Sequence, residues 1–182
     1  CYRLGLLSSM PDYFSDRSNI RHAGPGMPDI LLNFMDKIFV MELTLSVGAR
    51  QEATEGVSVF NHTMLEYRRY GDMFCGTVFL APIIDNNMMD KAIRGRYHAS
   101  DGVICDDLVV VPLNFDQAMH IFRYLVREFL EKDVQYMRTR WIDLMNDLGQ
   151  IIAKYRKDHD DASVVDACKL DIQAYVGALQ VG

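Results

Sequence analysis

Short apolar runs alternate along this chain with longer stretches in which apolar residues recur every three or four positions. The short runs Lys37–Val47, Phe74–Ala81 and Leu108–Leu113 are rich in β-branched and aromatic residues, which predicts buried strands. A further strand is expected at Asp29–Asn33. A turn at residues 34–36 joins it to the next strand, so the pattern predicts an antiparallel β-hairpin.

The periodic stretches predict amphipathic helices between the strands. The first is expected from Arg50 to about Tyr70, where Gly71 ends it. A loop is expected before the strand at residues 108–113. Further helices are expected at about Asn86–Tyr97, at Phe115–Leu130 behind the capping residue Asn114, and twice after Gln135 with a break at Asp158–Ala162.

This order of hairpin, helix, strand, helix, strand and helix predicts an α/β fold, with a small mixed sheet flanked by helices. We expect a core over residues 1–130 and a C-terminal helical extension over residues 131–182, packed on the core or used for interaction. Apolar positions of the last helices are expected to form a docking surface: Val164, Ala167, Leu170, Ile172 and Val176.

The composition is that of an ordinary globular protein, with 49% hydrophobic and 24% charged residues among 182. No apolar stretch is long enough to cross a membrane, and no signal-peptide pattern opens the chain, so no membrane partner is expected. The chain begins with Cys1 rather than Met, which we interpret as a cut or processed end. Residues 1–28 are rich in turn-forming residues.

The charge and the cysteines exclude some classes of function. A net charge of −6 argues against a bulk electrostatic grip on nucleic acid, although it does not exclude an enzyme that acts on nucleic acid. The four cysteines are scattered without a CxxC pair, and the five histidines show no zinc-binding spacing. We therefore expect free thiols in a reducing cytoplasm and no zinc enzyme.

One carboxylate lies in an unexpected place. Glu42 interrupts the apolar run IFVMELTLSV, where an ionised group costs several kcal/mol unless something compensates. A bound cation would compensate, and Mg²⁺ needs at least a second oxygen ligand. Asp29 opens the neighbouring strand directly after Pro28, and the hairpin brings it beside Glu42. Glu55 and His62 are seven residues apart on the following helix and so share one helical face, which predicts that all four side chains meet in one pocket.

These residues resemble the motif of the PD-(D/E)xK nuclease superfamily. The usual lysine of that motif is replaced here by Thr44. The stretch ELTLSVGARQEATEGVSVFNH further resembles the catalytic domain of AlwI-type type IIS restriction endonucleases, over roughly residues 25–125. In that group a small residue replaces the lysine, and a glutamine, a helical Glu-Gly and a histidine follow. The matching residues are Pro28-Asp29, Glu42-Leu43-Thr44, Gln51, Glu55-Gly56 and His62.

The resemblance implies hydrolysis of phosphodiester bonds in double-stranded DNA with Mg²⁺, for which Mn²⁺ can substitute. It implies that Asp29, Glu42 and Glu55 bind metal and that His62 orients or deprotonates the attacking water. The family also carries an acid before the Pro-Asp pair, but no Glu precedes Asp29 here. This chain would be the cleavage domain or subunit of a prokaryotic type IIS restriction–modification enzyme, located in the cytoplasm.

The same resemblance implies partners. DNA recognition would come from another domain or subunit, and a second catalytic domain, brought in by dimerisation, would be needed to cut both strands. Two basic groups, Arg68-Arg69 and the set Lys91, Arg94 and Arg96, can either contact phosphates or form a solvated face. The alternative function is a catalytically inactive nuclease-like domain that serves protein interaction.

Overall fold

Four strands form the central sheet, in the order β1-β2-β3-β6. The structure is a computed structural model that describes residues 28–34, 36–48, 51–98, 102–106, 108–158 and 163–180. The antiparallel β1–β2 pair is the predicted hairpin, while β2 pairs with β3, and β3 with β6, in parallel. The strands are β1 Ile30–Phe34, β2 Lys37–Leu43, β3 Phe74–Ala81 and β6 Val110–Asn114.

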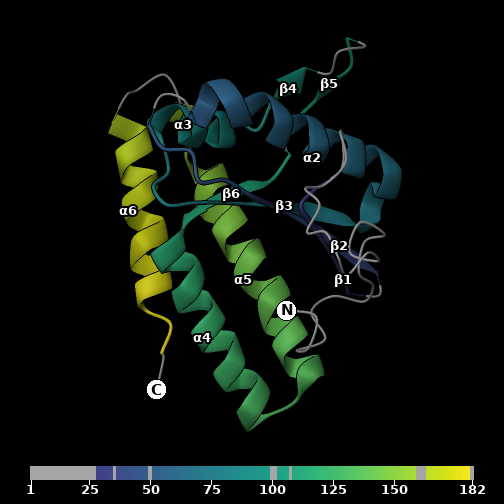
Figure 1. Cartoon of the computed structure of the whole chain (residues 1–182), viewed down its shortest axis with the longest axis vertical. Helices are drawn as coiled ribbons and strands as arrows, with labels where there is room; N and C mark the ends of the chain where they lie inside the picture. Colours follow the sequence, from purple (N-terminus) through teal and green to yellow (C-terminus); the bar gives the residue numbers. More distant parts are fainter. Residues whose placement is uncertain are drawn as a thin grey trace, which may run out of the picture.

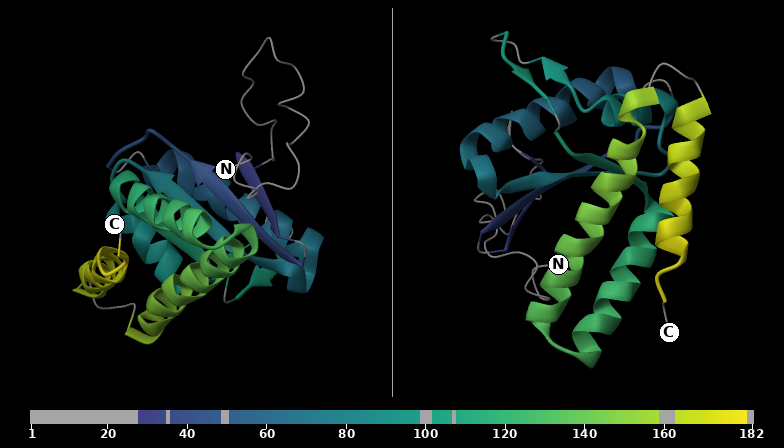
Figure 2. Two further views of the ribbon diagram at one scale, coloured as in Figure 1. Left: turned by 90° about the horizontal axis from the view of Figure 1, so that it is seen from below. Right: turned by 180° about the vertical axis from the view of Figure 1, so that it is seen from behind.

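Helices cover both faces of this sheet, which explains why the parallel strands are apolar along nearly their whole length (Figure 1). The helices α2 (Val57–Tyr70) and α3 (Asn86–Arg94) lie on one face. The helices α4 (Phe115–Glu131) and α5 (Val134–Lys154) lie on the other, as the two further views confirm (Figure 2). The last helix, α6 (Ser163–Gly177), packs beside α3, α4 and α5.

Side chains of β2 alternate between these two helical layers. Phe39 meets Trp141 of α5 edge to face, with ring centroids 6.1 Å apart. Glu42 points to the opposite face, where it meets His62 of α2. Because successive side chains of a strand point to opposite faces, Glu42 lies in the layer of α2 and the Phe39–Trp141 contact lies in the layer of α5.

The predicted helix at residues 50–70 is irregular at its start. Residues Glu52–Gly56 form a π-helix, η3, and only then does the α-helix α2 begin. The predicted strand at residues 37–47 ends at Leu43, and beyond it only the Thr44 N–H continues to bond across the sheet, to the Leu80 carbonyl. Short 3-10 turns follow α2 at Gly71–Met73 (η4) and α5 at Arg156–Asp158 (η5).

The predictions for residues 86–107 were wrong in two respects. The helix expected to reach Tyr97 ends at Arg94, because Gly95 takes a left-handed conformation (φ 62°) that caps it. The expected loop contains a second, two-stranded antiparallel sheet, β4 (Tyr97–His98) paired with β5 (Ile104–Cys105). This hairpin projects from the body of the molecule (Figures 1 and 2).

The C-terminal helices share one hydrophobic core with the sheet. Trp141, Leu144, Leu148 and Ile152 of α5 are buried in the same cluster as the strand residues. The expected docking surface on the last helix is largely internal, because Val164, Ile172 and Val176 are buried and, of the large apolar residues predicted there, only Leu170 is exposed. The boundary at residue 130 stays a prediction.

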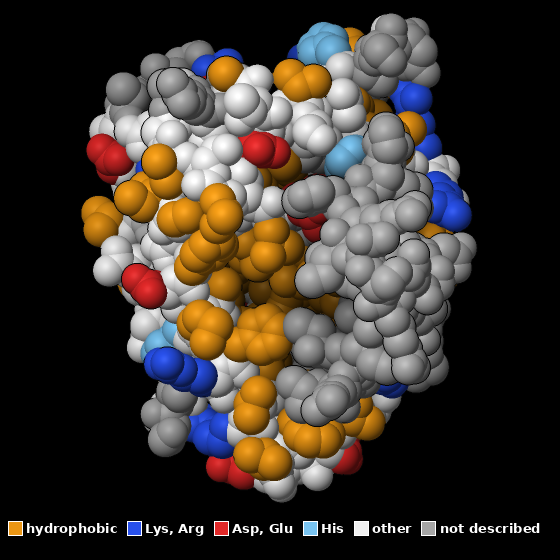
Figure 3. Space-filling view, viewed as in Figure 1, with side chains coloured by type: hydrophobic (Ala, Val, Ile, Leu, Met, Phe, Trp, Pro, Cys, Tyr) orange, Lys and Arg blue, Asp and Glu red, His pale blue; other side chains and the backbone are white. Residues whose placement is uncertain are grey.

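Hydrophobic side chains gather in the middle of the face shown in Figure 3, whereas Lys and Arg side chains lie toward its rim. Within the described residues, no helix is both long and apolar enough to cross a membrane. The cysteines there, Cys75, Cys105 and Cys168, are free thiols. The turn-rich stretch predicted before Pro28 and residues 159–162 of the predicted break after α5 lie outside the described residues.

Candidate active site

The hairpin register places Asp29 beside Glu42. Ile30 pairs with Met41, so one more step along the two strands brings Asp29 opposite Glu42. The two residues also exchange hydrogen bonds with the facing backbone: Asp29 Oδ2 accepts from the Leu43 N–H at 2.8 Å, and the Glu42 carboxylate accepts from the Asp29 N–H. The proximity predicted from the spacing of the two acids is therefore present in the fold.

Glu42 and His62 form the most direct contact of the site. His62 Nδ1 lies 2.8 Å from Glu42 Oε1, and the two side chains are 13% and 8% exposed. Burial raises the pKa of Glu42, and the negative charge of Asp29 adds to this, while the hydrogen bond from His62 opposes it. The hydrogen bond to Glu42 in turn raises the pKa of His62. A proton shared by Glu42 and His62, or a positive charge on His62, therefore lies close to the carboxylates of Glu42 and Asp29.

Glu55 lies in a separate set of hydrogen bonds. Thr44 Oγ1 donates to Glu55 Oε1 at 3.1 Å, Ser46 Oγ donates to the same oxygen at 3.5 Å, and the Ser46 N–H donates to Thr44 Oγ1 at 3.0 Å. Glu55 is carried by the π-helix η3, a type of helical irregularity that is frequent at functional sites. Glu55 and His62 thus contact different residues of the second hairpin strand and its extension, and the meeting of all four side chains in one pocket stays a prediction.

A buried amide holds this segment in place. Gln51 is fully buried, and its Nε2 donates to the carbonyls of Ser46 and Ile83 at 2.9 and 2.8 Å. Its Oε1 accepts from the Asp85 N–H at 2.9 Å. One side chain therefore ties the chain after β2 to the chain after β3, immediately before the π-helix that carries Glu55.

The geometry suits a hard cation with few protein ligands. In the described part of the chain, no three His, Cys, Asp or Glu side chains are close enough together to form a metal cage. Asp29 and Glu42, however, are two carboxylates close enough for their charges to repel each other. Mg²⁺ is usually held by one or two carboxylates, with water and substrate phosphate oxygens completing its shell, so this donor set fits that ion.

Glu66 belongs to the same region and was not predicted. It lies one helical turn after His62, is 4% exposed, and its negative charge contributes to the raised pKa of His62. Its Oε2 has no hydrogen-bond partner among the described residues, and Arg69 is 3.8 Å from its other oxygen. The i, i+4 spacing from His62 is the only sequence signal for it, and that spacing is common on helices.

Comparisons with known proteins agree with this fold. The structure is similar to that of the small subunit (R.BspD6I2) of the heterodimeric restriction endonuclease R.BspD6I, with a TM-score of 0.64 and 20% identity. The match covers 96% of this chain and 84% of that chain, and it confirms the predicted fold class. No curated protein matches the sequence.

The family relationship rests on the sequence. The model of the family described as AlwI restriction endonuclease matches residues 15–121, which is more than half of the chain and includes all four candidate site residues. The chain therefore belongs to the AlwI restriction endonuclease family.

Proposed function

We propose that this chain is a Mg²⁺-dependent endonuclease module that hydrolyses phosphodiester bonds of double-stranded DNA, as the cleavage domain or subunit of a type IIS restriction enzyme. One observation carries the proposal: in a member of a restriction endonuclease family, the buried Glu42 lies beside Asp29 and bonds to His62. A carboxylate buried without a cation is costly, and a metal bound there would offset that cost.

Asp29 and Glu42 are the residues that would hold the ion, each with a carboxylate oxygen to offer. Mg²⁺ bound there would polarise the scissile phosphate and lower the pKa of a bound water. One oxygen of Glu42, Oε1, is hydrogen-bonded to His62. The contact with His62 also fixes the orientation of the Glu42 carboxylate, as partners of metal-binding side chains commonly do.

His62 and Glu55 supply the remaining chemistry in this proposal. With Nδ1 of His62 engaged by Glu42, Nε2 is the nitrogen that would meet the attacking water and accept its proton. Glu55, held by Thr44 and Ser46, would bind a second ion or orient water next to the first. Thr44 occupies the position where the wider superfamily has lysine, and its hydroxyl cannot replace the positive charge of that lysine.

We further propose that the chain acts with a partner. The similar structure is a small subunit of a heterodimeric enzyme, and this chain is acidic overall. DNA-recognition surfaces are normally strongly basic, so sequence recognition would come from another domain or subunit. Because one such centre cuts one strand at a time, a second catalytic domain would be required for a double-strand break.

The decisive test replaces Glu42 by Gln, and separately Asp29 by Asn. Each change removes a negative charge and keeps the side-chain volume, so circular dichroism should show an unchanged fold. Calorimetry should show Mg²⁺ binding by the parent chain and its loss in both variants, and nicking of supercoiled plasmid should be abolished. The matched control is Glu131→Gln, an exposed acid at the end of α4.

Near-normal nicking by the Glu42 variant would contradict the site assignment. A parent chain that binds no divalent cation, and that cuts no DNA even with its recognition partner, would instead support the alternative of an inactive interaction domain.

A further inference from the structure

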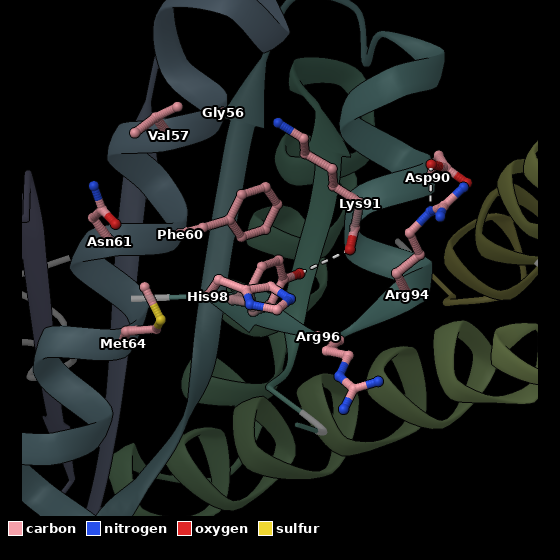
Figure 4. A pocket seen from close by; sticks show the side chains of 11 residues that line it. Gly56, Val57, Phe60, Asn61, Met64, Asp90, Lys91, Arg94, Arg96 and His98 are labelled. Carbon is pink, nitrogen blue, oxygen red and sulfur yellow. Dashed lines mark hydrogen bonds and ion pairs between the residues drawn. The ribbon is translucent and has the colours of Figure 1, made fainter. Parts of the chain in front are cut away.

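A second functional surface lies on the other side of α2. A pocket of about 430 Å³ opens between α2, α3 and β4 (Figure 4), a volume within the range of ligand-binding pockets. One wall contains Gly56 at the end of η3 and four residues of α2: Val57, Phe60, Asn61 and Met64. The other wall runs from α3 to β4 and contains Asp90, Lys91, Arg94, Arg96, Tyr97 and His98.

The pocket is locally positive on an acidic chain. Three of its side chains are cationic, Lys91, Arg94 and Arg96, against the single carboxylate of Asp90. Lys91 reaches from α3 toward α2 in Figure 4, and Arg94 is turned toward Asp90, at 2.8 Å. Arg96 lies 3.0 Å from Asp106, but both side chains of that pair are 60% exposed. Exposed pairs of this kind contribute little stability, so the guanidinium can exchange its partner for another anion at little cost.

The floor of the pocket is apolar and rigid. Phe60 and Tyr97 stack with ring centroids 4.2 Å apart and an interplanar angle of 19°. Both rings are buried, and the Tyr97 hydroxyl donates to the Lys91 carbonyl at 2.9 Å. Both residues of this stacked pair line the pocket. An apolar floor under a cationic rim matches a sugar flanked by phosphates.

The pocket and the candidate active site share one helical segment. Gly56 follows Glu55 directly, and Asn61 precedes His62 directly, but successive residues of an α-helix point about 100° apart. His62 therefore faces β2 while Asn61 faces the pocket. The two sites therefore lie on different sides of the same helix.

We propose that this pocket binds the sugar–phosphate backbone of a DNA strand next to the stretch that enters the candidate active site. Lys91 and Arg96 contact phosphate oxygens, and Phe60 and Tyr97 support the deoxyribose. The contacts are to the backbone and carry no base information, which suits a cleavage module that leaves sequence recognition to a partner. This inference rests on the proposed nuclease function.

The test measures binding without cleavage. Full-length chain is titrated onto a fluorescent DNA duplex in EDTA over a series of salt concentrations, and anisotropy gives the association constant. The variant Lys91→Gln/Arg96→Gln removes two charges from the pocket. Its matched control, Arg123→Gln/Lys132→Gln, removes two charges from α4 and its C-terminal end, on the opposite layer of the molecule.

Each phosphate contact contributes about 0.9 to the slope of log association constant against log salt, so the pocket variant should lose a slope of about 2. The control variant should keep the parent slope. Equal slopes in the pocket variant and the parent chain would overturn the proposal, as would an equal loss in the control.

The outcome also separates this inference from the nuclease proposal. Parent chain that nicks plasmid with Mg²⁺, together with a pocket variant whose slope is unchanged, would refute the pocket and leave the nuclease function standing. Parent chain that binds duplex through the pocket but never cuts it, even with its recognition partner, would refute the nuclease function alone.

Discussion

At the scale of single residues, Glu42 shows what a carboxylate in a strand core requires. Its neighbours act in opposite directions: burial and Asp29 favour the protonated acid, while His62 and the Asp29 N–H favour the ionised one. Its side chain is only 8% exposed where it meets His62. A divalent cation bound beside Glu42 would favour its ionised form.

Gly76 is a second residue whose identity the fold dictates. Its φ of 146° is one that other residues rarely adopt, and a Cβ there would lie 2.9 Å from the Val109 carbonyl oxygen. That oxygen accepts a hydrogen bond from the Thr77 N–H, so it cannot easily move. We expect Gly76→Ala to lower the free energy of unfolding by about 1–3 kcal/mol, measured by urea denaturation.

The control for this prediction is Gly177→Ala, because Gly177 ends α6 with open space around its Cβ position. It should leave stability unchanged or raise it by a few tenths of a kcal/mol, since Ala favours helix. Equal stability of the Gly76 variant and the parent chain would show that β3 and the chain before β6 are not as closely packed as described.

At the scale of elements, the π-helix η3 depends on the extension of β2. Thr44 is buried and donates to Glu55, so its role is to position that acid. We expect Thr44→Val, which keeps the shape and removes the hydroxyl, to lower DNA nicking less than Glu55→Gln or His62→Ala does.

A double-mutant cycle tests whether Thr44 acts through Glu55. If it does, Thr44→Val combined with Glu55→Gln should be no less active than Glu55→Gln alone. Additive losses in the double variant, or a single Thr44 variant as inactive as the acids, would contradict this role.

Elements with a long, regular pattern could be predicted from the sequence. The apolar run Phe74–Ala81 coincides with β3, and the Asn114 cap and its capping box fix the start of α4. The strands β4 and β5 are two residues long, too short to show any alternation. The π-helix was missed because apolar spacing does not distinguish a wider helical turn over five residues.

The candidate site, too, could be predicted from the sequence only in part. Asp29 and Glu42 are joined by a hairpin, whose register follows from the turn, so their spacing was sufficient to pair them. The contact of His62 with Glu42 crosses from the sheet to the next helix, and its partner depends on how α2 packs, which spacing alone does not give. Glu66 was missed because burial, rather than spacing, distinguishes it from an ordinary helical acid.

At the scale of the whole molecule, the C-terminal helices belong to the structure that supports the site. Arg156 donates to the carbonyls of Ile93 and Leu108, and Lys169 donates to that of Ile84. We therefore expect a chain that ends at Glu131 to lose cooperative unfolding in urea, because the sheet face under α5 would be exposed.

A chain that ends at Gln180 is the control, since it retains every helix and should unfold like the full chain. Cooperative unfolding of the shorter chain would show instead that residues 1–130 are an independent domain.

The position of the candidate site along the chain has a consequence for its synthesis. All four site residues lie between positions 29 and 62, whereas the core includes side chains as late as Val176. A ribosome adding about 5–20 residues per second therefore completes the site residues on the order of ten seconds before α6, which packs beside α3, α4 and α5, exists. During that interval the acids are present but the sheet that aligns them has one face uncovered. The candidate site is therefore fully supported only after α6 has been added to the chain.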